Sequence, residues 1–290
     1  MPVNPRHALA ALIAVALLAA SAGAAAPSKS LILWEQDDAS SARPVALWTT
    51  TGDGTNARRV VLLPASGFYG ARLTTAGDVI YATLDPSRSN VADLRLSRHG
   101  RTSRLFSVKG LRNFAPSPDR TTIAYGRALP VAGRPEIVIA KLDGTLVRVA
   151  AQDVGSTLSW SNDGTTLFAY GLWSSACGLC AISTSTGARR SITFPYKNMT
   201  GRPVVSPSGT RFAFCDLKGP SGERIYSASG TRLRSFAGIC SGDALWAPGE
   251  TRLLLQEPSL AVLDLHTGTV TPFTHAGPAN LRALDWVRAG

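Results

Sequence analysis

Four cysteines are the residues whose spacing most directly suggests chemistry in this sequence. Cys177-Gly-Leu-Cys180 has the C-x-x-C spacing of redox and metal-binding motifs, and Cys215 and Cys240 follow it. A haem-attachment motif requires a His directly after its second Cys, and none stands after Cys180. The alternating strands and helices that surround a redox C-x-x-C motif are also missing. Four thiolates can hold zinc. In an oxidising compartment, two disulfides are the favoured alternative.

The sequence lacks the sets of residues that hydrolytic enzymes use. A serine hydrolase needs a Gly-x-Ser-x-Gly elbow with Asp and His later in the chain, and this sequence has no such elbow. His99, His266 and His275 each lie in or beside a predicted turn, where a solvated side chain is expected. The acidic group at 35–38 lacks the regular ligand spacing of a calcium loop. We therefore predict no catalytic residue, no metal site and no cofactor.

A repeat organises the elements that must position any functional residue. Five segments share a strand, a tight polar turn and a second apolar strand, and their starts are 43, 44, 45 and 41 residues apart: Leu73-TTAGDVIYA, Pro116-SPDRTTIAY, Trp160-SNDGTTLFA, Val205-SPSGTRFAF and Trp246-APGETRLLL. Each period continues with a third strand that ends at a turn glycine, and then with a fourth strand. A period of this size and content is typical of β-propeller blades.

The two ends of the chain complement each other. Residues 31–63 supply a second, a third and a fourth strand with no first strand before them, while 284–288 supply a first strand with nothing after it. Together they complete one shared blade. With the five continuous blades, this predicts an all-β, six-bladed β-propeller of four-stranded antiparallel blades. The shared blade removes the open sheet edge of a linear array.

The turn motifs resemble a known family. Ser-Pro-Asp at 117–119, Ser-Asn-Asp-Gly at 161–164 and Ser-Pro-Ser-Gly at 206–209 are each followed by an apolar strand. They are similar to the repeats of TolB-like propellers, which also occur in prolyl oligopeptidases. The resemblance covers the chain from about residue 30 to the end. It implies a six-bladed propeller, here without the N-terminal α/β domain of TolB, and a role in binding.

Four arginines lie where the chain leads into the inner strands, at the predicted mouth of the central tunnel: Arg72, Arg112, Arg202 and Arg282. Some six-bladed propellers hold a divalent ion in the tunnel through carboxylates and amides, but only Asn113 and Asp243 could serve as ligands here. So basic a mouth repels a cation. It suits a carboxylate, a phosphate or an acidic peptide, because Arg offers a planar set of donors to such anions. The alternative is that these are ordinary solvated loop arginines.

Four other arginines each lie four residues after a turn glycine, which places them on the outermost strands: Arg58, Arg104, Arg148 and Arg234. We expect them to blunt the exposed sheet edges against edge-to-edge association. A monomer is therefore expected.

Strand direction predicts how the cysteines pair. Cys215 ends a second strand, Cys240 lies in the loop toward the next first strand, and Cys177 and Cys180 flank the start of a third strand. All four therefore lie toward the same end of the propeller. We expect Cys215 to pair with Cys240, at the Cα separation of roughly 5.5 Å that a bridge requires, and Cys177 with Cys180. A bridge between Cys180 and Cys215 is the alternative.

The N-terminal region has the order of a secretory signal peptide. A basic start precedes an apolar stretch over 8–20, and small residues offer a cleavage site near Ala24 to Ala26. The apolar stretch is shorter than the roughly 20 residues that cross a bilayer. We predict a signal peptide over 1–26 and a single propeller domain over 27–290. The mature protein would be periplasmic or secreted, without a transmembrane segment.

Charge and fold together define the expected function. The chain carries 30 Lys+Arg against 19 Asp+Glu, a net charge of +11, which favours acidic partners. Nucleic acid is not expected as a partner of an exported protein. We expect a non-catalytic module that binds an acidic protein or peptide in the cell envelope. Two alternatives stay open: a propeller hydrolase or lactonase with an unrecognised tunnel site, and an envelope structural protein held by charge to anionic polymers.

Overall fold

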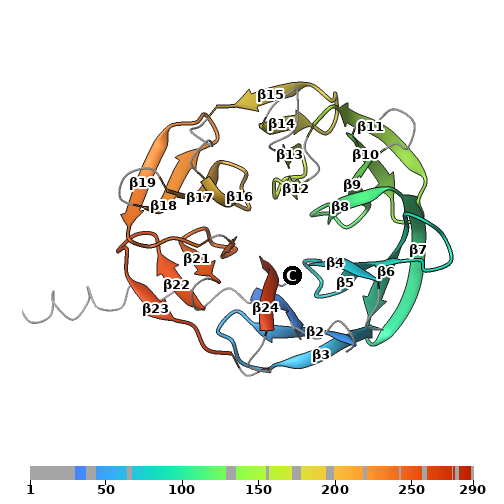
Figure 1. The fold of residues 1–290 in the computed structure, drawn as a ribbon, viewed down its shortest axis with the longest axis horizontal. Helices are drawn as coiled ribbons and strands as arrows, with labels where there is room; N and C mark the ends of the chain where they lie inside the picture. Colours follow the sequence, from blue (N-terminus) through green and yellow to red (C-terminus); the bar gives the residue numbers. More distant parts are fainter. Residues whose placement is uncertain are drawn as a thin grey trace, which may run out of the picture.

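Six four-stranded antiparallel sheets are arranged as the blades of a ring (Figure 1). The computed structural model describes residues 30–36, 44–63, 67–128, 135–154, 157–171, 178–193, 199–217, 221–241, 243–256, 260–275, 277 and 281–288. The predicted signal peptide lies outside them. Within these ranges there is no helix that is long and apolar enough to cross a membrane. The all-β, six-bladed prediction is confirmed.

Each blade runs from an innermost strand to an outermost one. The innermost strands are β24 (Leu281–Arg288), β4 (Phe68–Leu73), β8 (Leu111–Pro116), β12 (Thr157–Trp160), β16 (Met199–Val205) and β20 (Ala244–Trp246). The second strands are β1 (Ser30–Gln36), β5 (Val79–Leu84), β9 (Thr122–Ala128), β13 (Thr166–Tyr170), β17 (Arg211–Asp216) and β21 (Arg252–Leu255). The third strands are β2 (Val45–Thr51), β6 (Val91–Arg98), β10 (Pro135–Lys141), β14 (Leu179–Ser183), β18 (Gly222–Ser227) and β22 (Ala261–Asp264).

The outermost strands are β3 (Arg58–Leu63), β7 (Arg101–Lys109), β11 (Leu146–Gln152), β15 (Arg189–Ile192), β19 (Arg232–Ala237) and β23 (Val270–Pro272). Blade 1 joins β24 to β1, β2 and β3, and blades 2 to 6 follow in chain order with four consecutive strands each.

The hydrophobic core lies between the blades. Second strands carry runs of buried residues rather than an alternating pattern, as in β13, where 167–170 are all buried. This follows because neighbouring blades cover both faces of each sheet. One core cluster joins Ile80 and Leu94 of blade 2 to Phe114 and Ile123 of blade 3. Packing between adjacent blades therefore holds the ring together.

Blade 1 is closed by strands from the two ends of the chain. β24 pairs antiparallel with β1, in a register that runs from Ser30 opposite Arg288 to Gln36 opposite Leu281. Trp286 on β24 is only 9% exposed, and its indole Nε1 donates a hydrogen bond to Ser30 Oγ at 3.2 Å. The predicted sharing of one blade is confirmed.

A disulfide joins Cys215 at the end of β17 to Cys240 in the loop before β20, with Cα atoms 5.1 Å apart. This is the expected pairing. Cys180 is also disulfide-bonded, and since Cys215 is bonded to Cys240, the alternative bridge between Cys180 and Cys215 is not formed. Cys177 lies outside the described residues.

A buried carboxyl group lies beside this disulfide. Glu223 on β18 is opposite Cys215 in the strand register and is 1% exposed. Its Oε2 accepts one long hydrogen bond, from the backbone N of Ser241 at 3.5 Å. Burial raises the pKa of Glu223 to about 7, although the Ser241 amide and the charge of Arg224 act in the opposite direction. The carboxyl is therefore mostly protonated below neutral pH.

The closure predicts the effect of a short truncation. Deleting the last eight residues removes most of β24 and with it the buried Trp286, so the free energy of unfolding should fall by at least about 4 kcal/mol, as for loss of a buried Trp. Chemical denaturation measures this. Deleting only the last two residues is the control and should leave the midpoint unchanged. An unchanged midpoint for the longer deletion would show that the ring does not depend on β24.

The buried carboxyl predicts a pH dependence of stability. Between the ordinary pKa of 4.5 and about 7, the unfolded chain has released the Glu223 proton while the folded protein keeps it, so the unfolding free energy falls as pH rises through this window. The loss is on the order of 3 kcal/mol. Glu223→Gln should remove it, as measured by urea denaturation from pH 4 to pH 8.

The control for this pH experiment is Glu136→Gln. Glu136 is also buried, but its carboxylate is ion-paired with Arg127 at 2.5 Å, so this variant should keep the wild-type fall in stability. If the Glu223→Gln and wild-type curves run parallel, Glu223 does not titrate in this window.

Candidate functional site

A cavity of about 570 Å³ lies at the centre of the ring and is lined by the innermost strands of all six blades. Five of the lining residues directly precede the residue that opens a repeat segment, and a sixth holds the equivalent position before Trp286, which lies 40 residues after Trp246: Arg72, Ala115, Ser159, Val204, Leu245 and Asp285. The repeat thus places one residue of each blade at the same level of the tunnel. A volume of this size is within the range of ligand-binding pockets.

Tight turns after the innermost strands form one rim of the cavity. In two of these turns the serine Oγ accepts a hydrogen bond from the amide N five residues later, Thr122 N to Ser117 and Thr166 N to Ser161, both at 3.0 Å. The same hydroxyls donate to the turn aspartates Asp119 and Asp163 at 2.5 and 2.6 Å. These serine hydrogen bonds are the main cause of the lowered pKa of both aspartates.

The position after this serine, or after the Thr74 or Ala247 that replaces it, lies against the cavity in five blades: Thr75, Pro118, Asn162, Pro207 and Pro248. The turn motifs that carry the family resemblance therefore shape the rim of the tunnel, and their aspartates are engaged within the turns.

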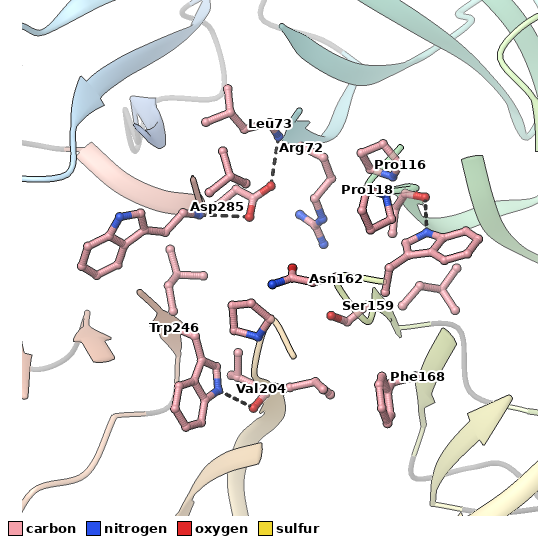
Figure 2. A pocket seen from close by; sticks show the side chains of 18 of the residues that line it. Arg72, Leu73, Pro116, Pro118, Ser159, Asn162, Phe168, Val204, Trp246 and Asp285 are labelled. Atoms are coloured by element: carbon pink, nitrogen blue, oxygen red, sulfur yellow. Dashed lines mark hydrogen bonds between the residues drawn. The ribbon is translucent and has the colours of Figure 1, made fainter. Parts of the chain in front are cut away.

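Arg72 is the cationic residue at the level of the six equivalent positions. Figure 2 shows that Arg72 and Asn162 both reach toward the middle of the cavity. The guanidinium Nη1 donates to the carbonyl oxygen of Ala71 at 3.0 Å, and Nη2 approaches Asn113 Oδ1 at 3.5 Å. A guanidinium has five N–H donors. Because no described carboxylate lies within 4.0 Å of Arg72, donors remain for a ligand.

Asp285 is the acidic residue at the same level, on the neighbouring blade. Its Oδ2 accepts a hydrogen bond from the backbone N of Leu73, and its Oδ1 accepts one from the backbone N of Trp286, both at 3.0 Å. Burial raises the pKa of Asp285, while the charge of Arg72 and the two amides oppose the rise. Both oxygens are thus occupied by the backbone, and the residue joins blade 1 to blade 2 (Figure 2).

The three predicted mouth arginines whose side chains are described do not form one group. Arg72 lines the cavity, whereas Arg112 is exposed and away from its lining. Arg282, at the position of β24 equivalent to that of Arg112 in β8, forms an ion pair with Asp243 at 2.6 Å. Arg202 lies on β16, and its side chain is outside the described part of the structure. Arg72 alone among the described three faces the tunnel.

The potential metal ligands have other partners. Asn113 Oδ1 accepts a hydrogen bond from the backbone N of Phe114 at 2.7 Å and faces Arg72, and Asp243 is paired with Arg282. Among the described residues there is no group of three His, Cys, Asp or Glu that could hold a metal ion. Both predicted ligands therefore face donor groups of the protein itself.

Asp285 and Asn162 are site residues that sequence reasoning missed. The signal was present in the repeat, because aligning the six segments puts Asp285 in the same column as Arg72, where it is the single acidic residue. Its partner amides on Leu73 and Trp286 could not be read from the sequence, since they depend on how blade 1 meets blade 2.

No protein-family model and no curated protein matches the chain. Among solved structures, the chain is similar to TolB from Acinetobacter baumannii, with a TM-score of 0.69 and 15% identity over 95% of this chain and 71% of that chain. It is also similar to a putative TolB from Agrobacterium tumefaciens, with a TM-score of 0.57 and 13% identity over 91% and 99% of the two chains.

A structure described as a nidogen/laminin complex is similar too, with a TM-score of 0.63 and 12% identity over 89% of this chain and 97% of that chain. At these identities the likeness shows a shared fold. The structures of TolB propellers thus share the architecture of this chain, in agreement with the resemblance of the turn motifs.

Proposed function

We propose that this chain is an exported, non-catalytic propeller that binds an acidic segment of a partner protein or peptide at its central tunnel. The observation that carries the proposal is Arg72, a guanidinium that reaches into a 570 Å³ cavity without a carboxylate within 4.0 Å among the described residues. Arg matches the planar oxygen pair of a carboxylate, and such charge-assisted hydrogen bonds are stronger than neutral ones. Three of the five rim positions are prolines, Pro118, Pro207 and Pro248, which offer apolar surface to a peptide.

The same cavity favours binding over catalysis. The two acidic residues on its described lining are both engaged, Asp285 with backbone amides and Asp243 with Arg282. No histidine is among the described lining residues. A hydrolase or lactonase needs a convergent acid, base or metal set, so the enzyme alternative has less support from the described wall.

Export to the periplasm or beyond is part of the proposal. The Cys215–Cys240 disulfide supports it, because disulfides persist in oxidising compartments. The signal-like order of residues 1–26 supports it from the sequence. We propose a monomer, since the arginines on the outermost strands oppose edge-to-edge pairing.

Selection from a peptide library tests the tunnel. A display library of random linear peptides, selected on wild-type protein and counter-selected on Arg72→Gln, should enrich peptides that carry carboxylates. The affinity of an enriched peptide, measured by fluorescence anisotropy, should fall about tenfold or more in Arg72→Gln, because a hydrogen bond to a charged group contributes roughly 1.5–3 kcal/mol.

Arg112→Gln is the matched control for this experiment. It removes the same charge from an exposed residue of an innermost strand that does not line the cavity, so affinity should change by less than about twofold at physiological salt, where exposed charges are screened. Equal losses in the two variants, or enriched peptides without acidic groups, would contradict binding at Arg72.

A further inference from the structure

The outermost strands of the propeller carry basic residues and no acidic ones. Ten Lys and Arg residues lie on five of these six strands: Arg58 and Arg59 on β3, Arg101, Arg104 and Lys109 on β7, Arg148 on β11, Arg189 and Arg190 on β15, and Arg232 and Arg234 on β19. We call these ten residues the basic wall. Asp and Glu are absent from all six strands, β23 included.

The basic wall accounts for ten of the eleven net positive charges of the whole chain. Of the 30 Lys+Arg, twenty lie elsewhere, and they nearly match the 19 Asp+Glu. The excess of positive charge is therefore concentrated at the circumference of the ring, where Figure 1 places β3, β7, β11, β15 and β19. Nine of the ten side chains are exposed, and Arg148 is half-buried.

Several wall arginines are held in place by the neighbouring blade. Arg148, Arg190 and Arg234 each donate from Nη1 to a carbonyl oxygen in the hairpin of the next blade: to Thr184 at 3.0 Å, to Ala228 at 3.0 Å and to His266 at 3.4 Å. A carbonyl is neutral, so these hydrogen bonds orient the guanidinium without cancelling its charge. Since each guanidinium has five donors, the exposed Arg190 and Arg234 keep most of theirs available for an anion, at a reduced cost in side-chain entropy. The Nε of the half-buried Arg148 is itself buried.

Acidic groups compensate only a small part of the wall. Among the described residues, Arg104 is the one member of the wall with an ion pair, its Nε lying 3.2 Å from Asp93. The acidic residues Asp53, Asp143 and Asp264 lie in turns at the ends of third and fourth strands, where turn hydrogen bonds hold their carboxylates. On the outermost strands themselves, no Asp or Glu lies beside the positive charges.

We propose that the basic wall binds a flexible anionic polymer, which follows the circumference from blade to blade. The shape of the wall selects this partner. Its charges point outward around a convex ring, so a flat anionic membrane can touch only one or two blades at a time. A flexible chain can contact several blades, and each neutralised phosphate or carboxylate releases counterions that favour binding. This surface is separate from the tunnel and does not depend on the function proposed for it.

Binding of inorganic polyphosphate tests the proposal. Long-chain polyphosphate should bind the full chain more tightly than triphosphate at equal total phosphate, as measured by isothermal titration calorimetry over a range of salt concentrations. The wall variant, which removes three charges of the basic wall, is Arg58→Gln/Arg101→Gln/Arg232→Gln, on blades 1, 2 and 5. These three side chains make no hydrogen bond or ion pair within the described residues, so their replacement leaves the contacts between blades intact. The slope of log K against log salt should decrease by about 2, at roughly 0.7 per contact.

The matched control is Arg112→Gln/Arg120→Gln/Arg252→Gln, which removes the same charge from exposed positions away from the outermost strands. It should keep the wild-type slope. Equal losses in the two triple variants would overturn the proposal in favour of a general charge effect. Vesicles of phosphatidylglycerol that bind as tightly as the polymer, and whose binding is weakened as much by the wall variant, would overturn it in favour of a membrane surface. Absence of polyphosphate binding would overturn it outright.

Discussion

The pairing of β24 with β1 is the contact on which the rest of the structure depends. Five blades are each built from one continuous stretch of chain, but blade 1 exists only when the two ends of the described chain meet. The closing strand also provides part of the site, because Asp285 on β24 lines the cavity and accepts the Leu73 amide of blade 2. Ring closure and the geometry of the tunnel are therefore one event, and a loss of closure would also lose the site.

Side-chain hydrogen bonds join the innermost strands of three pairs of neighbouring blades. Each innermost strand has one edge without a partner strand, and its backbone groups need hydrogen bonds. Trp160 Nε1 donates to the Ala115 carbonyl at 2.9 Å, and Trp246 Nε1 donates to the Val204 carbonyl at 2.8 Å. Asp285 serves the Leu73 amide in the same way. Polar side chains at the end of the inner strands thus do between blades what backbone pairing does within a blade.

Charge is distributed by layer. The tunnel holds a few charges that are mostly engaged, the middle strands are largely buried between neighbouring blades, and the outermost strands hold the positive excess. Arginines on these outer strands have two consequences at once. Arg148, Arg190 and Arg234 link blades 3 to 4, 4 to 5 and 5 to 6 through carbonyl oxygens. Their charge stays on the surface, where it is free to oppose association between copies or to attract anions.

The sequence by itself determined the architecture of this protein. The period near 43 residues, the turn glycines and the mismatched strands at the two ends were enough for six blades and a shared blade, because strand alternation and turn residues act over short distances along the chain. The pairing of Cys215 with Cys240 followed from strand direction. The sequence did not determine which of the predicted site residues face the cavity. Four arginines looked equivalent, yet Arg72 faces the cavity, Arg112 is exposed and Arg282 pairs with Asp243. Which way a side chain points, and which group from another blade meets it, depends on the packing of residues tens to hundreds of positions apart, so only the tertiary structure decided it.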